Sequence, residues 1–179
     1  MNKSDWRNHF RQLLEINKAD YDDEALNKIF NKHLSEFLKT QTGLWAGYSP
    51  MKHEPKLNSV SSLDWVFPVV HEGRLRWFQP GPKGFQAGSF SIQEPIMEGA
   101  KEFHVTDLSG VLIPGLGFDK SGVRLGWGKG FYDKAFSKIS GKVKKVGVIW
   151  EAQFVERLPS EDHDLKVDLV ITEKGIHQI

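Results

Sequence analysis

Cysteine is absent from the 179 residues of this chain, and its absence excludes several kinds of site. Without thiols the protein has no disulfide, no thiolate metal ligand and no cysteine nucleophile. A cysteine-free chain fits a reducing compartment, so we expect a cytoplasmic protein. An excess of either positive or negative charge is also lacking, with 24 Lys and Arg against 23 Asp and Glu. The formal net charge is +1, which provides no global field toward nucleic acid or an anionic membrane.

Long apolar runs are missing as well. No segment approaches the roughly 20 apolar residues that a membrane-spanning helix requires. The N-terminal sequence MNKSDWRNHF is polar and charged and lacks the apolar centre of a signal peptide. The seven histidines form no HxxxH pair, which argues against a histidine-built zinc site. We therefore expect neither a membrane nor a nucleic-acid partner.

The remaining composition predicts one packed domain over residues 1–179. The hydrophobic fraction of 39% and the aromatic fraction of 12% are typical of a folded protein. The length suits a single domain, and we expect a monomer.

Two helices are predicted near the N-terminus. Apolar residues at helical spacing from Trp6 to Leu14 indicate the first, with Ser4 or Asp5 as its cap. A second apolar stripe indicates a helix over about 23–39. Both stripes are the pattern of core-packing helices.

The rest of the chain alternates between strand and helix patterns. Strands are predicted at 43–50, 66–70, 74–78, 108–115, 142–150 and 167–176. Short helices are predicted at 58–65 and 132–139, and a long loop rich in Gly, Pro and Gln at 79–94. This alternation predicts an α/β fold with a mixed, mostly parallel sheet layered by helices.

The most unusual segment is RLGWGKGFYD, residues 124–133, with glycine at 126, 128 and 130. It lies between a predicted strand and a predicted helix, a setting in which bare backbone N–H groups can meet an anion. Glycine lets the backbone approach a phosphate, and Lys129 and Arg124 add positive charge. Asp133, at the start of the predicted helix, is either a first-turn carboxylate or a Mg²⁺ ligand.

Two well-known phosphate-binding patterns do not fit this segment. A P-loop requires Ser or Thr after its lysine, whereas Gly130 follows Lys129. The dinucleotide fingerprint requires Gly-x-Gly-x-x-Gly, whereas these glycines are evenly spaced. The spacing alone leaves two interpretations, a phosphate-binding loop of another kind or a structural glycine turn. Asp119, in FDKSG, is predicted to be a turn residue rather than a catalytic one.

A longer segment, IPGLGFDKSGVRLGWGKGFYDKAF at 113–136, resembles the signature of the 5-formyltetrahydrofolate cyclo-ligase family, also called methenyltetrahydrofolate synthetases. Shorter matches are KSDWR, GYSPMKHEP, FSIQEP and HDLKVDLVIT, in the family's order over nearly the full length. The chain departs from the family pattern at three positions. Trp6 replaces a leucine, Trp127 is bulky at a variable position, and Pro55 stands where a hydrophobic residue is usual.

The resemblance implies an ATP- and Mg²⁺-dependent enzyme. The family converts 5-formyltetrahydrofolate and Mg-ATP to 5,10-methenyltetrahydrofolate, ADP and phosphate. Transfer of the γ-phosphoryl group to the formyl oxygen turns a poor leaving group into a good one, and N10 of the folate then closes the ring. Such chemistry needs positioning and charge neutralisation more than a protein nucleophile. The predicted catalytic residues are the cations Lys129 and Arg124.

The resemblance also implies residues for each ligand. The implied ATP site consists of Lys3, Arg7, Arg124, Leu125, Gly126, Trp127, Gly128, Lys129, Gly130, Phe131 and Tyr132. The implied folate site consists of Glu54, Phe90, Trp127, Gly128, Lys129, Gly130 and Phe131. The implied Mg²⁺ ligands are Asp133 and Asp164.

Most of these residues also have an ordinary structural interpretation. Lys3 and Arg7 fit a solvated helix face, and Asp164 fits a surface charge beside a strand. Glu54 fits a loop carboxylate, and Phe90 fits a core aromatic as well as a cover for the pteridine ring.

Two functions of other classes remain as alternatives. The first is a relative of the same fold that binds folate or nucleotide without turnover. The second is an RNA-binding module that uses Lys129, Arg124 and exposed aromatic residues as a stacking platform. The near-neutral net charge disfavours the RNA-binding alternative, because binding to a phosphate backbone usually leaves a basic footprint.

Overall fold

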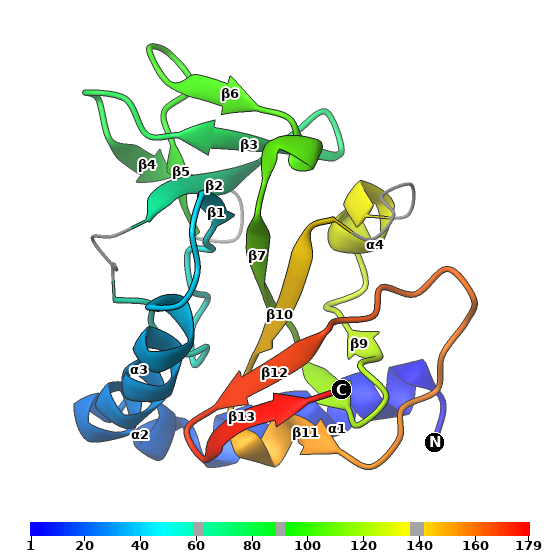
Figure 1. Cartoon of the computed structure of the whole chain (residues 1–179). Helices are drawn as coiled ribbons and strands as arrows, with labels where there is room; N and C mark the ends of the chain where they lie inside the picture. The colour runs from blue at the N-terminus through cyan, green and yellow to red at the C-terminus, as the bar shows by residue number, and fades with distance from the viewer. Residues whose placement is uncertain (59–62, 89–91, 137–141) are drawn as a thin grey trace.

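The computed structural model describes residues 1–58, 63–88, 92–136 and 142–179. Its described elements are three N-terminal helices, a large sheet, two small sheets and a short fourth α-helix (Figure 1). The helices are α1 (Lys3–Ile16), α2 (Lys18–Tyr21), α3 (Glu24–Leu38) and α4 (Phe131–Phe136), with 3₁₀ turns at Val105–Asp107 and Glu151–Gln153.

The first helix begins at a capping box. The Asn2 side chain accepts hydrogen bonds from the backbone N–H groups of Ser4 and Asp5, and the Asp5 carboxylate accepts one from the Asn2 N–H. The cap is therefore Asn2, and the prediction of Ser4 or Asp5 as cap was wrong by two or three positions. The helix predicted over 23–39 is confirmed as α3, and Asp23 is its cap.

The large sheet has the strand order β13-β12-β10-β7-β1-β2-β3-β6. Its strands are β1 (Leu44–Ala46), β2 (Asp64–His71), β3 (Arg74–Gln79), β6 (Lys101–Phe103), β7 (Gly110–Pro114), β10 (Lys144–Val148), β12 (Leu169–Thr172) and β13 (Gly175–Gln178). The central pairs β12-β10, β10-β7, β7-β1 and β1-β2 are parallel, and the outer pairs are antiparallel. The predicted mixed, mostly parallel sheet is confirmed.

The central strands are covered on both faces, as their continuous apolar sequence indicates. On β7, Leu112 packs into a core with α1 and α3, whereas Val111 and Ile113 pack into a second core that contains Phe136 of α4. Figure 1 shows α3 and α4 on opposite sides of β7 and β10. The fold is therefore layered by helices, with the sheet between two apolar cores.

Small strands complete the structure. The antiparallel pair β4 (Phe85–Ala87) and β5 (Gln93–Pro95) overlaps the segment 79–94 that was predicted to be a loop, so that prediction was wrong in part. A three-stranded sheet has the order β11-β8-β9, built from β11 (Phe154–Val155), β8 (Gly117–Asp119) and β9 (Arg124–Leu125). Strands this short carry too few residues to show a period in the sequence.

Three further predicted elements differ from the structure. Asp64 and Trp65 belong to β2 rather than to a helix over 58–65, of which residues 59–62 lie outside the described residues. The predicted helix at 132–139 begins at Phe131, and its residues after 136 also lie outside the description. The predicted strand at 167–176 is two antiparallel strands, β12 and β13. None of the described helices combines the length and apolar composition needed to cross a bilayer.

Candidate active site

A cavity of about 280 Å³ lies beside the carboxyl ends of β1 and β7, the edge where open parallel sheets commonly bind ligands. Its lining combines apolar side chains of β2 and β3 with the glycine-rich segment. The lining residues are Tyr48, Ser49, Met51, Glu54, Pro68, Val70, Leu75, Ile92, Glu94, Pro114, Arg124, Gly126, Trp127, Lys129, Gly130, Phe131 and Tyr132. The cavity thus brings most of the predicted folate residues together.

We call residues 126–130 the glycine loop. Glycine is favoured at its three glycine positions for different structural reasons. Gly128 has φ of 106° and Gly130 has φ of 66°, values that favour glycine. At Gly126 a Cβ would lie 2.7 Å from Arg124 Nη1, so this position leaves room for the guanidinium. Lys129, between the last two glycines, is exposed and lines the cavity.

Arg124 is buried at the wall of the cavity. Its Nε donates to the Pro114 carbonyl at 2.9 Å, and its guanidinium lies 4.8 Å from the centre of the Tyr132 ring. Its Nη1 lies 3.9 Å from Asp133 Oδ2. Burial lowers the pKa of Arg124, opposed by the charge of Asp133, and the group stays a cation at neutral pH. A fixed, desolvated positive charge therefore faces the cavity.

Glu54 is 6% exposed and is held by two donors. Its Oε2 accepts from the Met51 N–H at 2.8 Å, and its Oε1 accepts from the Trp127 indole at 3.4 Å. Burial raises the pKa of the Glu54 carboxyl to about 6, although these hydrogen bonds and the Arg124 charge act in the opposite direction. Glu54 and Trp127, both predicted to bind folate, are thus in contact.

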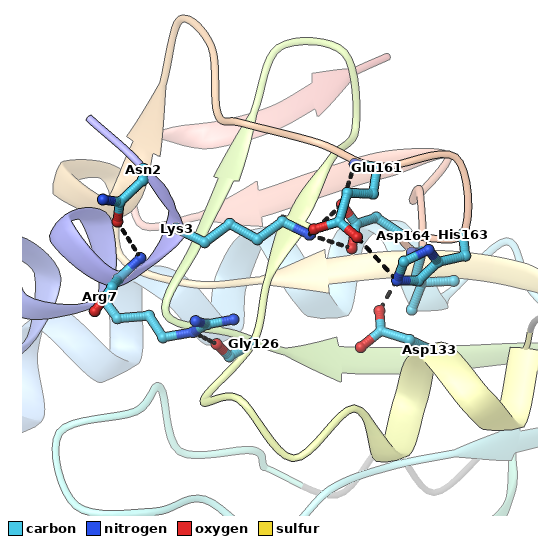
Figure 2. Close-up of polar contacts among 10 residues, drawn as sticks. Asn2, Lys3, Arg7, Gly126, Asp133, Glu161, His163 and Asp164 are labelled. Carbon is cyan, nitrogen blue, oxygen red and sulfur yellow. Dashed lines mark hydrogen bonds and ion pairs between the residues drawn. The ribbon is translucent and has the colours of Figure 1, made fainter.

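A second group of contacts joins the N-terminus of α1 to the segment 161–164. Lys3 Nζ lies 2.8 Å from Asp164 and 2.9 Å from Glu161 (Figure 2). Burial lowers the pKa of the Lys3 ammonium, but the hydrogen bonds and charges of Asp164 and Glu161 outweigh it and raise that pKa. The predicted phosphate-binding lysine and a predicted metal ligand therefore form an ion pair.

Asp133 links this corner to the cavity. It lies on α4, and its Oδ1 accepts from the Leu165 N–H at 3.2 Å. Asp133 and Asp164 line the same hollow of about 490 Å³, together with His163 and Asp162. Among the described residues no group of three or more acidic, histidine or cysteine side chains is arranged to hold a metal alone. Two carboxylates beside residues predicted to bind phosphate are a set that suits Mg²⁺, which usually takes one or two carboxylates plus phosphate and water oxygens.

Two arginines of α1 contact the glycine loop. Arg7 Nε donates to the Gly126 carbonyl at 3.0 Å, and Arg11 lies 5.9 Å from the centre of the Trp127 ring. Figure 2 shows Arg7 and Lys3 extending from the same end of the chain toward the loop and toward Asp164. The prediction from KSDWR placed Lys3 and Arg7 at this site. The structure brings Arg7 beside the glycine loop, predicted to bind ATP, and Lys3 beside Asp164, predicted to bind Mg²⁺.

The Leu125 side chain, predicted to bind ATP, does not line the cavity. The Leu125 side chain is buried in the α1 and α3 core, and its carbonyl accepts from the Leu116 N–H at 2.8 Å. Phe90 lies outside the described residues. Asp119 is fully buried, and its carboxylate accepts from the N–H groups of Ser121, Val123 and Leu158, which confirms its prediction as a turn residue.

Residues 54–173 match the model of the 5-formyltetrahydrofolate cyclo-ligase family. The chain belongs to this family. The matched segment includes the glycine loop, Glu54 and both predicted metal ligands.

Relatives of this cyclo-ligase family member span most of its length. It is 29% identical to the 5-formyltetrahydrofolate cyclo-ligase of Mycolicibacterium smegmatis, over 71% of this chain and 72% of that protein. It is 27% identical to the 5-formyltetrahydrofolate cyclo-ligase of Mycoplasma genitalium, over 92% of this chain and 96% of that protein. The NMR structure of Aquifex aeolicus 5,10-methenyltetrahydrofolate synthetase matches with a TM-score of 0.80 at 28% identity, covering 99% and 93%. The Mycoplasma pneumoniae synthetase, at 22% identity and a TM-score of 0.75, shares the fold.

The structure adds residues to the site that the family signature did not single out. Glu94 is a second buried carboxylate on the cavity wall, and Arg11 contacts Trp127. Glu94 belongs to the quoted motif FSIQEP, but its burial depends on the β4-β5 pair, which the sequence did not reveal. Arg11 shares the helical spacing of Arg7, at i and i+4, and that spacing was the available signal.

Proposed function

We propose that this protein converts 5-formyltetrahydrofolate and Mg-ATP to 5,10-methenyltetrahydrofolate, ADP and phosphate. The observation that carries the proposal is the pairing of two sites through Arg124 and Asp133. Arg124 lines the 280 Å³ cavity with Glu54 and Trp127, and Asp133 lines the 490 Å³ hollow with Asp164. A reaction that phosphorylates a bound folate needs such adjacent sites, and membership of the cyclo-ligase family supports the same assignment.

The chemistry requires charge neutralisation where the γ-phosphoryl group moves. Its transfer to the formyl oxygen forms an O–P bond and breaks the bond to ADP. N10 then attacks the formyl carbon, loses its proton, and the ring closes as the C–O bond breaks and phosphate leaves. Lys129 and the fixed Arg124 guanidinium are the cations proposed to stabilise the transferred charge. Lys3 and Arg7 are proposed to contact the nucleotide phosphates.

Asp133 and Asp164 are the proposed Mg²⁺ ligands. The ion would supply charge neutralisation for the nucleotide phosphates. Lys3 would exchange Asp164 for a phosphate oxygen, since its ammonium is already positioned within 2.8 Å of that carboxylate. A cytoplasmic location and a monomeric state belong to the proposal, and light scattering on the purified protein tests the latter.

The reaction is tested directly. Purified protein is mixed with 5-formyltetrahydrofolate and Mg-ATP, and the near-ultraviolet absorbance of the methenyl product is followed beside an ATP-free control. An ATP-dependent rise is expected. A flat trace from folded protein contradicts turnover, and calorimetry with ATP and folate separately then tests the binding-only alternative.

The metal assignment is tested by Asp133→Asn. The amide keeps an oxygen to accept the Leu165 N–H but removes the charge, so we expect the Mg²⁺ concentration for half-maximal rate to rise about tenfold. The measurement is a magnesium titration at fixed ATP. Asp20→Asn, at an exposed position on α2, is the control. An unaltered titration in Asp133→Asn would rule out this ligand.

A further inference from the structure

Glu94 has a carboxylate that the described structure leaves largely unsatisfied. It lies on β5, is 8% exposed, and lines the 280 Å³ cavity. Its Oε1 accepts from the Val70 N–H at a long 3.4 Å, and no other hydrogen bond or ion pair to this carboxylate occurs among the described residues. Oε2 is not among the enclosed, unpaired polar atoms of the described residues, so it opens to the cavity and can accept a donor from a ligand.

The neighbouring Gly88 leaves the space that this carboxylate occupies. A Cβ at position 88 would lie 2.3 Å from Glu94 Oε2 and 2.4 Å from its Cδ. Gly88 is not among the glycines with positive φ, so its backbone conformation does not require glycine. The absence of a side chain therefore serves the placement of Glu94.

Glu94 differs from Glu54 in what it offers to a ligand. Both oxygens of Glu54 already have protein donors, Met51 and Trp127. Glu94 Oε2 has none among the described residues. Pro68, Val70 and Ile92 line the same cavity. Because Glu94 Oε2 has no donor among the described residues, a ligand that pairs with it must itself supply one.

We infer that Glu94 binds the substrate by accepting hydrogen bonds from the N–H edge of its heterocycle. This inference rests on the proposed function. The pyrimidine ring of a reduced folate presents an N3–H and a 2-amino group side by side, and two parallel donors match the two oxygens of one carboxylate. Glu94 is thus a specificity-determining residue for the folate, in addition to Glu54, and has no role toward ATP.

The test measures binding of each substrate separately by calorimetry. For Glu94→Gln, we expect the Kd for 5-formyltetrahydrofolate to rise about 10- to 100-fold, the usual loss for a hydrogen bond to a charged group, and the Kd for Mg-ATP to stay within twofold. Glu98→Gln is the matched control, since Glu98 is an exposed glutamate close in sequence that pairs with Lys83. An unchanged folate Kd in folded Glu94→Gln overturns the inference.

A ligand change separates direct contact from a structural effect. The 2-desamino analogue of the folate lacks one donor, so wild-type protein should bind it weakly, and Glu94→Gln should weaken it little further. If Glu94→Gln weakens binding of the analogue as much as it weakens binding of the folate, the direct contact is overturned. Gly88→Ala, which displaces the carboxylate without removing it, should also weaken folate binding and serves if Glu94→Gln does not fold.

Failure of the proposed function gives a different pattern. A wild-type protein that binds 5-formyltetrahydrofolate but forms no methenyl product refutes the reaction, whereas the comparison of wild type with Glu94→Gln still decides the role of Glu94. A wild-type protein that does not bind this folate overturns the inference as well.

Discussion

Lys129 and Arg124 carry the same charge in the same segment but have different surroundings. Arg124 is buried and bonded to the Pro114 carbonyl, whereas Lys129 is exposed on the glycine loop. Removal of Arg124 would disturb packing and charge together. Lys129 is therefore the residue whose replacement reports on charge alone.

For Lys129→Ala we expect kcat/KM for ATP to fall about 100-fold, because one charge-stabilising donor is lost from the transferred phosphoryl group. The melting temperature should not change, since the side chain is exposed. Steady-state kinetics at low and saturating ATP provide the measurement, with Lys28→Ala on α3 as the control. Identical kinetics in Lys129→Ala and wild type would remove Lys129 from the mechanism.

Glu54 makes stability depend on pH in the direction opposite to that of a salt-bridged carboxylate. Because burial raises its pKa from 4.5 to about 6, the folded state binds the proton more tightly than the unfolded state. The contribution of Glu54 to stability is therefore lost as pH rises between these values. Above about pH 6 the cost is on the order of 2 kcal/mol.

Glu54→Gln should thus be more stable than wild type at pH 7 by on the order of 2 kcal/mol, and the difference should vanish below pH 4.5. Denaturant unfolding at both pH values measures it. Folate affinity should fall in the same variant. A stability difference that does not depend on pH would show that the carboxyl is not desolvated in the folded protein.

At the scale of elements, a close approach between Phe10 and Gly117 helps to hold α1 beside the site. Phe10 is fully buried, and a Cβ at Gly117 of β8 would lie 2.4 Å from its ring. The same helix carries Arg7 and Arg11 to the glycine loop and Lys3 to Asp164. The packing of Phe10 against Gly117 therefore helps to position three cations.

Gly117→Ala should displace α1 and lower stability by about 1–3 kcal/mol, the usual cost of overpacking a core. It should also raise the KM for ATP more than that for folate, because α1 supplies the proposed phosphate contacts. Thermal unfolding and kinetics measure the two effects. Phe10→Leu in the same chain should restore part of both. Wild-type stability in Gly117→Ala would mean that the contact is not tight.

Elements with a clear period were predictable, and those fixed by distant contacts were not. The stripes of α1 and α3 and the apolar runs of β7 and β10 predicted the layers. The sheets containing β4 and β11 were missed, because strands of two or three residues depend on their partners. The Asn2 cap was missed because Ser4 and Asp5 are equally good cap residues.

The same division holds for the site. The glycine loop could be predicted from the local sequence, because glycine is the residue that favours the positive φ found at Gly128 and Gly130. The Lys3–Asp164 pair, separated by 161 residues, was available only through family resemblance. The burial of Glu94 against Gly88 depends on tertiary structure, and no sequence pattern reports it.

At the scale of the whole molecule, the two apolar cores share their strands. Leu112 and Ile113 are neighbours on β7 but pack into different cores. We propose on this ground that residues 1–179 form one domain, because neither core can lose its sheet without exposing the other.

Scanning calorimetry should therefore show one transition, with a van't Hoff enthalpy equal to the calorimetric enthalpy. Saturating Mg-ATP at 100 times its Kd should stabilise that whole transition by about 3 kcal/mol. Two separated transitions, or stabilisation confined to part of the heat absorbed, would contradict the single domain.

The contact between Phe10 and Gly117 also constrains the order of folding. Helix α1 is made early in synthesis, but its docking surface includes a residue more than 100 positions later. Strand β1 likewise cannot complete its pairing until β7 has been made, because Trp45 pairs with Gly110. Closing such long loops before contacts form slows folding, and apolar faces stay uncovered meanwhile. During synthesis, α1 and β1 therefore lack these partners until Gly110 and Gly117 have been added to the chain.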